Sequence, residues 1–155
     1  MRSRTARPGS TTHGTDARLA SFRAFLRAHA RVTRQIEREL QAEQGLALAD
    51  YDLMAELSAA PGRRVRMGEL AERLVLSRSG ITRLVDRLQA DGLVQRHVCE
   101  GDRRGQWAAI TDAGQARFRG ARRTHMRCVA RHFGNRIPAG DHATLERMLG
   151  EVAPD

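Results

Sequence analysis

The chain has 155 residues and a formal net charge of +9 at pH 7, and 41% of its residues are hydrophobic. This length fits one structural domain overall, and no apolar run approaches the roughly 20 residues that a bilayer-spanning helix needs. All 27 basic residues are arginine, whose planar guanidinium suits phosphates and guanine edges. We therefore expect a cytoplasmic protein that has a polyanionic partner and no contact with a membrane. Arginine on solvated helix faces is the alternative interpretation.

The N-terminal third predicts an arm followed by a long helix. Residues 1–15 combine three arginines and no acid with Ser, Thr, Gly and Pro, which is typical of a disordered basic arm. Apolar residues at helical spacing predict one helix over 16–45, ended by Gly45. Because such a helix is too long for a compact monomer of this size, we expect it to pack against a second copy of the chain.

The segment 46–112 predicts three helices and a hairpin. Asp50 precedes a helix closed by Pro61 and Gly62, a short helix surrounds Leu70, and Ser77 is a good N-cap for a helix that stops at Asp91 and Gly92. Residues 93–98 and 106–110 are strand-like and flank a polar loop that contains glycine. This order is typical of a winged helix-turn-helix, in which the second helix of the motif enters the DNA major groove.

The remaining segment, 112–155, predicts two C-terminal helices. Thr111 is placed to cap a helix that runs to about Gly134, and Pro138 begins the last helix. Seven arginines and no acid occur between residues 117 and 136, so the first of these helices is strongly basic.

The helix that begins after Ser77 has one apolar side and one polar side at 100° per residue. Small hydroxyls beside arginine suit base edges and phosphates, although an ordinary amphipathic surface helix has the same pattern. We expect Asp86 to orient Arg83, which lies one helical turn earlier. The candidate DNA-binding residues on the polar side are Arg78, Ser79, Thr82, Arg83 and Arg87.

The hairpin loop adds a second candidate contact. It places Arg103 and Arg104 at the tip of a two-stranded ribbon, where they suit the negative potential of a minor groove. Asp102 is spaced to hold Arg104 in place, which leaves Arg103 as the DNA contact.

With these motifs the chain resembles the MarR family of bacterial transcriptional regulators. The resemblance rests on residues 70–74 and 76–88 and on the wing pattern of Asp102, Arg104, Ile110 and Thr111. It implies a mainly α fold with a small β-hairpin wing, in which N- and C-terminal dimerisation helices flank the winged helix-turn-helix. It also implies a homodimer.

The chain departs from the family pattern at two places. Arg66, Met67 and Gly68 stand where the family often has a Ser or Thr cap, so we expect the short helix to start weakly or one residue later. Gly80 removes a side chain from the recognition helix, which puts the base preference of this chain in question.

MarR-like proteins are released from DNA by small aromatic ligands, by thiol oxidation or by metal, and this chain has residues for each. Phe22, Phe25, His29, Tyr51 and Met54 are candidates to line a ligand pocket, with core packing as the alternative. His29, His125, Cys128 and His132 are candidate zinc ligands, with hydrogen-bonded interface residues as the alternative. Cys99 is a candidate redox thiol or a small apolar filler.

The leading hypothesis is a homodimeric, sequence-specific regulator, a repressor of transcription released by a small ligand. It would bind a pseudo-palindromic operator in double-stranded DNA, with half-sites about one helical turn apart. The alternative is a non-specific or architectural DNA-binding protein. No P-loop, nucleophile elbow, carboxylate pair or dinucleotide fingerprint occurs in the sequence, so we expect no enzyme activity and no cofactor.

Overall fold

The structure is a computed structural model that describes residues 12–99 and 102–153, with side chains at 16–98 and 106–153. The chain divides into two units, Met1–Arg34 and Gln35–Asp155, which are considered separately below. None of the helices in these ranges is long and apolar enough to cross a membrane.

The first unit contains the start of α1 (Thr12–Gln44), which begins before the predicted start at Asp16. The disordered arm was expected over residues 1–15, but residues 12–15 belong to α1, and residues 1–11 lie outside the described residues. In the rest of the unit, apolar side chains are exposed along the helix, with 56% of Phe22 and 46% of Phe25 accessible to solvent. The ring centroids of Phe25 and His29 are 6.3 Å apart. Leu19 and Leu26 continue this exposed apolar stripe.

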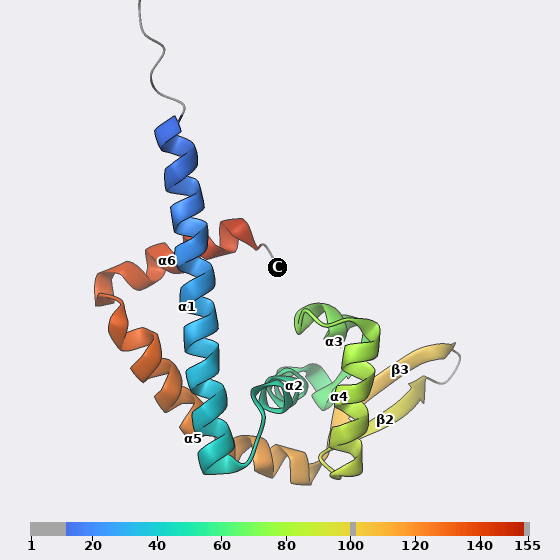
Figure 1. Cartoon of the computed structure of the whole chain (residues 1–155). Helices are drawn as coiled ribbons and strands as arrows, with labels where there is room; N and C mark the ends of the chain where they lie inside the picture. Colours follow the sequence, from blue (N-terminus) through green and yellow to red (C-terminus); the bar gives the residue numbers. More distant parts are fainter. Residues whose placement is uncertain (1–11, 100–101, 154–155) are drawn as a thin grey trace, which may run out of the picture. The chain divides into compact units, whose positions relative to one another are not determined.

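The second unit holds the hydrophobic core, and its helices follow the predicted order (Figure 1). Leu40 of α1, Leu53 and Met54 of α2, Leu70 of α3 and Val85 of α4 are fully buried. The elements are α2 (Leu48–Ala59), a 3₁₀ turn (Pro61–Arg63), β1 (Arg64–Arg66), α3 (Met67–Arg73), α4 (Arg78–Ala90), β2 (Val94–Cys99), β3 (Asp102–Ile110), α5 (Asp112–His132), two 3₁₀ turns (Gly134–Arg136 and Ala139–Asp141) and α6 (His142–Val152).

The three strands form one antiparallel sheet in the order β1-β3-β2. Val65, Val94, Ala108 and Ile110 are buried and form the inner face. The β2–β3 hairpin was predicted from the sequence. Strand β1 was not, because a strand of three residues with a single apolar side chain has no detectable alternation.

Two predicted helix caps are confirmed. Ser77 Oγ accepts a 3.1 Å hydrogen bond from the Gly80 amide, and Thr111 Oγ1 accepts a 3.0 Å hydrogen bond from the Gly114 amide. The Thr111 hydroxyl also lies 2.8 Å from the carbonyl oxygen of Gly92, so it joins α5 to the turn before β2. By contrast, α3 starts at Met67 with no side-chain cap bond from Arg66.

A second close contact fixes the start of α5. A Cβ added at Gly114 would lie 2.1 Å from the carbonyl oxygen of Leu93 and 2.8 Å from Cγ1 of Ile110. Glycine therefore allows the first turn of α5 to lie directly against the backbone that leads into β2.

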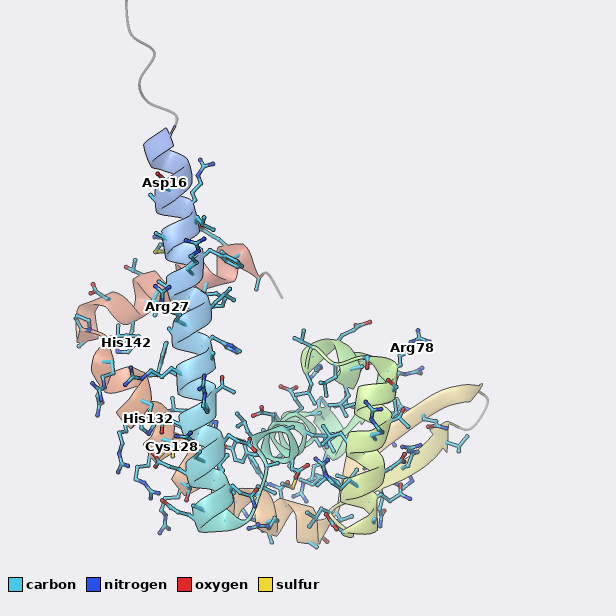
Figure 2. The ribbon with its side chains drawn as sticks, viewed as in Figure 1. Asp16, Arg27, Arg78, Cys128, His132 and His142 are labelled. Atoms are coloured by element: carbon cyan, nitrogen blue, oxygen red, sulfur yellow. The ribbon has the colours of Figure 1, made fainter. Side chains whose placement is uncertain are left out.

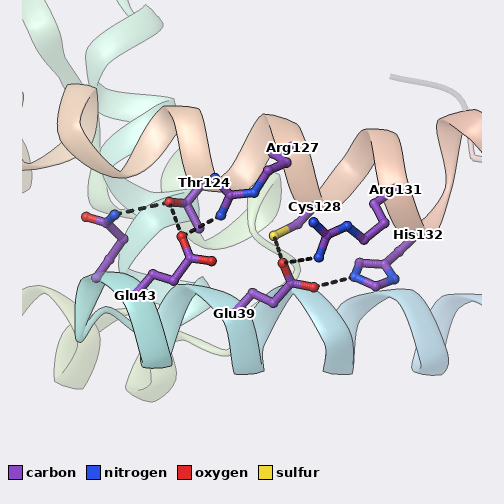
Figure 3. Close-up of polar contacts among 8 residues, drawn as sticks. Glu39, Glu43, Thr124, Arg127, Cys128, Arg131 and His132 are labelled. Carbon is purple, nitrogen blue, oxygen red and sulfur yellow. Dashed lines mark hydrogen bonds and ion pairs between the residues drawn. The ribbon is translucent and has the colours of Figure 1, made fainter.

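The C-terminal end of α1 packs on α5 through two carboxylates (Figure 3). Glu43 binds Arg127 and the Thr124 hydroxyl. Glu39 contacts His132 and accepts hydrogen bonds from Cys128 at 3.1 Å and Arg131 at 3.4 Å.

The bonds from His132 and Cys128 lower the pKa of Glu39. Burial, aided by the Glu39 carboxylate, raises the pKa of the Cys128 thiol to about 11, which keeps it protonated.

Candidate nucleic-acid interface

Helix α4 separates its two faces as the periodicity predicts. Ile81, Leu84, Val85 and Leu88 are buried in the second unit. The five candidate DNA-binding residues on α4 are all exposed, and Figure 2 shows Arg78 at the beginning of the helix with its side chain directed away from it. The polar face of α4 is therefore free to meet a partner.

The hydroxyl groups on this face have defined roles before any partner binds. Thr82 Oγ1 donates a 2.8 Å hydrogen bond to the carbonyl oxygen of Arg78. Ser79 Oγ lies 3.1 Å from Ser77 Oγ. Because its proton is used within the helix, Thr82 offers its methyl group and acceptor lone pairs, which suit a thymine methyl or an exocyclic amino group.

The arginines of α4 fall into two groups. Among the described side chains, Arg78 and Arg83 have no acidic partner. Arg87 is ion-paired with Asp50 of α2. Its guanidinium therefore links α4 to α2, a role that competes with the predicted contact to DNA.

Asp86 has a different partner from the one expected. It is ion-paired with Arg96 of β2 rather than with Arg83. The strand brings Arg96 beside α4, whereas the predicted pairing considered only neighbours on the helix. Asp86 thus joins the recognition helix to the hairpin and leaves Arg83 free.

Gly80 also has a different significance from the one expected. A Cβ there would lie 3.2 Å from Ser77 Oγ and 3.7 Å from Cβ of Leu76. The position points back to the turn before α4, so a larger side chain would crowd the cap. The lack of a side chain at position 80 therefore removes no group from the exposed polar face of α4.

The side chains of Cys99, Asp102, Arg103 and Arg104 lie outside the described residues. The expected minor-groove contact, the supporting role of Asp102 and the redox role of Cys99 stay predictions.

The candidate ligand-pocket residues are distributed over the two units. Tyr51 and Met54 are buried in the second unit, which agrees with the core-packing alternative for these two. Tyr51 stacks on His125 with ring centroids 4.2 Å apart, and Phe118 lies on Tyr51 at 5.2 Å. Phe22, Phe25 and His29 belong to the exposed face of α1 in the first unit.

The candidate zinc ligands of α5 do not converge. His125 stacks on Tyr51, whereas Cys128 and His132 both contact Glu39. In the two described ranges, no group of three His, Cys, Asp or Glu side chains is arranged to hold a metal ion. The hydrogen-bonded alternative describes Cys128 and His132.

Sequence reasoning missed a further basic feature on the sheet. Arg64 and Arg66 of β1 lie over the ring of Trp107 on β3. The missed strand concealed the pairing, because only its register places these residues together.

Helix α4 has one buried and one exposed face, begins at a capped turn and lies beside a three-stranded sheet. This combination defines a winged helix-turn-helix DNA-binding protein. A model described as the MarR family matches residues 44–105. The chain is 33% identical to AbsC, a MarR family transcriptional regulator from Streptomyces coelicolor, with a TM-score of 0.82 over 89% of this chain and 93% of that chain.

Two further solved structures are similar. Sco3205, a MarR family regulator from Streptomyces coelicolor in complex with DNA, is 30% identical with a TM-score of 0.81, covering 87% of this chain and 88% of that one. CouR from Rhodococcus jostii, bound to p-coumaroyl-CoA, is 25% identical with a TM-score of 0.73, covering 85% and 91%. No curated protein matches. The chain belongs to the MarR family of transcriptional regulators, which bind DNA.

Proposed function

We propose that the protein is a homodimeric repressor that binds a pseudo-palindromic operator and is released by a small aromatic effector. The observation that carries the DNA-binding part is the exposed polar face of α4. It presents Arg78 and Arg83 without acidic partners beside Ser79 and Thr82. Arginine suits guanine O6 and N7, and the Ser79 hydroxyl suits a base or a phosphate. Thr82 offers its methyl group and acceptor lone pairs to base edges.

Exposed apolar side chains support a homodimer. The stripe on α1, which includes Phe22 and Phe25, has no cover within its own unit, and on α6 Met148 and Val152 are 54% and 79% exposed. Large apolar side chains at this density are typical of surfaces that a partner covers. A second copy of the chain would also supply the second recognition helix that a pseudo-palindrome requires.

The aromatic cluster of the second unit supports an aromatic effector. The buried Nδ1 of His125 has no hydrogen-bond partner among the described atoms, and its ring stacks on Tyr51. Burial lowers the pKa of His125, so at neutral pH the ring is uncharged and offers one donor and one acceptor. An aromatic acid or ester that displaced part of this packing would stack on the cluster and engage this nitrogen. The relative CouR was crystallised with p-coumaroyl-CoA.

The test begins with selection of bound fragments from random duplex DNA, followed by fluorescence anisotropy at physiological salt. A specific regulator should prefer the selected site over mixed-sequence DNA by at least about 10³-fold, and light scattering should give a dimer. Equal affinity for both duplexes would contradict the proposal and favour the architectural alternative. Release is then measured with p-coumaroyl-CoA and simple phenolic acids, with zinc and peroxide as separate arms that test the metal and thiol alternatives.

A further inference from the structure

The outer face of the sheet carries a tryptophan beneath two arginines. The guanidinium carbons of Arg64 and Arg66 lie 5.1 Å and 5.2 Å from the ring centroid of Trp107. The register places Arg66 opposite Trp107, and His97 of β2 is opposite Trp107 on its other side. We call these four residues the arginine–tryptophan platform.

The platform is strongly biased toward positive charge. Neither Arg64 nor Arg66 has an acidic partner among the described side chains, whereas the adjacent Arg63 is ion-paired with Asp112 at 3.4 Å. Two guanidiniums on one face of a short strand repel each other, and a bound anion would relieve that repulsion. Within the described part of the strands, the outward positions of the sheet include no acid; they are Arg64, Arg66, Gln95, His97, Trp107 and Ala109.

Contact with the indole ring prepares the two guanidiniums for phosphate. A guanidinium that lies over an aromatic ring keeps its N–H edge free to donate. The ring also limits the rotamers of the arginine, so less entropy is lost when it binds an anion. Phosphate oxygens accept such paired donors in a bidentate way. Arg64 and Arg66 are both exposed and therefore open to a backbone of this kind.

The platform is continuous with the DNA-binding elements. Arg66 directly precedes α3, the first helix of the helix-turn-helix, and Trp107 and His97 belong to the two strands of the wing. We propose that the platform binds phosphates of the operator duplex that flank the segment contacted by α4, and so lengthens the stretch of DNA that the protein covers. This inference rests on the proposed DNA-binding function.

The test compares two duplexes that contain the selected site, one of about 20 base pairs and one of about 40 base pairs with added flanks. The double variant Arg64→Gln with Arg66→Gln keeps most of each aliphatic stem and removes both charges. On the longer duplex we expect the homodimer to bind at least about tenfold more weakly. Its salt slope should fall by about 3.6, since each of the four phosphate contacts of the two platforms contributes about 0.9. Binding to the shorter duplex should change little.

Two further variants make the result specific. The double variant Arg136→Gln with Arg147→Gln removes the same charge from the C-terminal segment, and it should leave the difference between the duplexes unchanged. Trp107→Leu keeps an apolar side chain and the full charge but removes the ring, so it should weaken binding to the longer duplex only. Urea unfolding of each variant confirms that the dimer is folded, and Trp107→Leu provides the test should the arginine variant unfold.

The outcomes separate this inference from the function on which it rests. If the unaltered protein binds none of the three DNAs (the shorter duplex, the longer duplex and mixed-sequence DNA), the proposed DNA-binding function itself is rejected. Unaltered binding by the platform variants on the longer duplex overturns the inference, because the two arginines would then contribute no phosphate contact. An equal loss on both duplexes also overturns it, because the contact would then lie within the segment that α4 covers.

Discussion

Arg96 of β2 is ion-paired with Asp86 of α4, and the same guanidinium nitrogen lies 3.5 Å from the carbonyl oxygen of Thr82. One arginine therefore connects the hairpin to α4, the helix that carries the proposed base-contacting face. We therefore expect the orientation of the wing relative to α4 to depend on the ion pair between Arg96 and Asp86.

This ion pair predicts the direction in which operator affinity changes when Asp86 is removed. Removing an acid near DNA normally strengthens binding, but Asp86→Ala should weaken operator binding because it releases Arg96 and the hairpin. Arg96→Met should weaken it similarly, and a double-mutant cycle should give a coupling of about 1 kcal/mol. Anisotropy with the selected duplex measures the cycle. Tighter binding by Asp86→Ala would show that the ion pair does not position the wing.

Arg83 and Arg87 should behave differently although both are exposed on α4. Arg83→Ala should cost ~1–3 kcal/mol of operator binding and relax base preference, as expected for a contact to guanine. Arg87→Ala should instead lower the free energy of unfolding by about 1 kcal/mol, because it leaves Asp50 without its ion-pair partner. Selection on random DNA and urea unfolding separate the two effects. A loss of base preference in Arg87→Ala alone would reverse the assignment.

The close approach at the start of α5 predicts a strong effect of one methyl group. Gly114→Ala should lower the free energy of unfolding by about 3 kcal/mol, since its Cβ would overlap the carbonyl oxygen of Leu93. The control is Gly120→Ala on the same helix, where no atom lies within 4 Å of an added Cβ. That change should stabilise the protein by up to about 1 kcal/mol through helix propensity. Both are measured in urea at one protein concentration, because the proposed dimerisation would affect apparent stability.

Val75, in the turn between α3 and α4, has a positive φ of 53° and is 90% exposed. A β-branched residue in this left-handed region is strained, and its exposed side chain contributes little packing. Val75→Gly should therefore raise the free energy of unfolding by about 0.5–1 kcal/mol, after the greater entropy of glycine is subtracted. The same substitution at Val98, exposed on β2, should destabilise. If Val75→Gly instead lowered the free energy of unfolding, the backbone of Val75 would not be strained.

The sequence predicted features that depend on near neighbours along the chain. The apolar period of α4 and the caps at Ser77 and Thr111 all act within a few residues, and the structure confirms them. The partners of Asp86 and Arg87 could not be predicted from the sequence, because these ion pairs join residues from separate elements. The Trp107 stack depends likewise on the register of β1.

Asp52 predicts an unusual dependence of stability on pH. Burial, together with Glu56 and Glu37, raises its pKa from about 3.8 to about 6. Since the folded state binds this proton more tightly than the unfolded chain, the group favours folding most below pH 3.8, and that contribution is lost as pH rises to 6. Asp52→Asn should therefore stabilise the protein by about 2 kcal/mol at pH 7.5 and by about half as much near pH 5, because pH 5 lies between the pKa of the unfolded chain and that of the folded state.

Urea unfolding at these two pH values checks the prediction, with Asp91→Asn as a control at an exposed carboxylate. Measurements stay at pH 5 or above because the lowered pKa of Glu39 gives stability that is lost only below about pH 4.5. An equal effect of Asp52→Asn at both pH values would mean that the carboxyl of Asp52 does not titrate in this window.

Trp107 is the only tryptophan in the chain, and the guanidinium carbons of Arg64 and Arg66 lie over its ring. The intrinsic indole emission of the protein therefore comes from a single known position on the outer face of the sheet. Any ligand or partner that displaces either arginine will change that emission, whereas events confined to other surfaces will leave it constant. The unlabelled protein thus contains an optical reporter of this one surface.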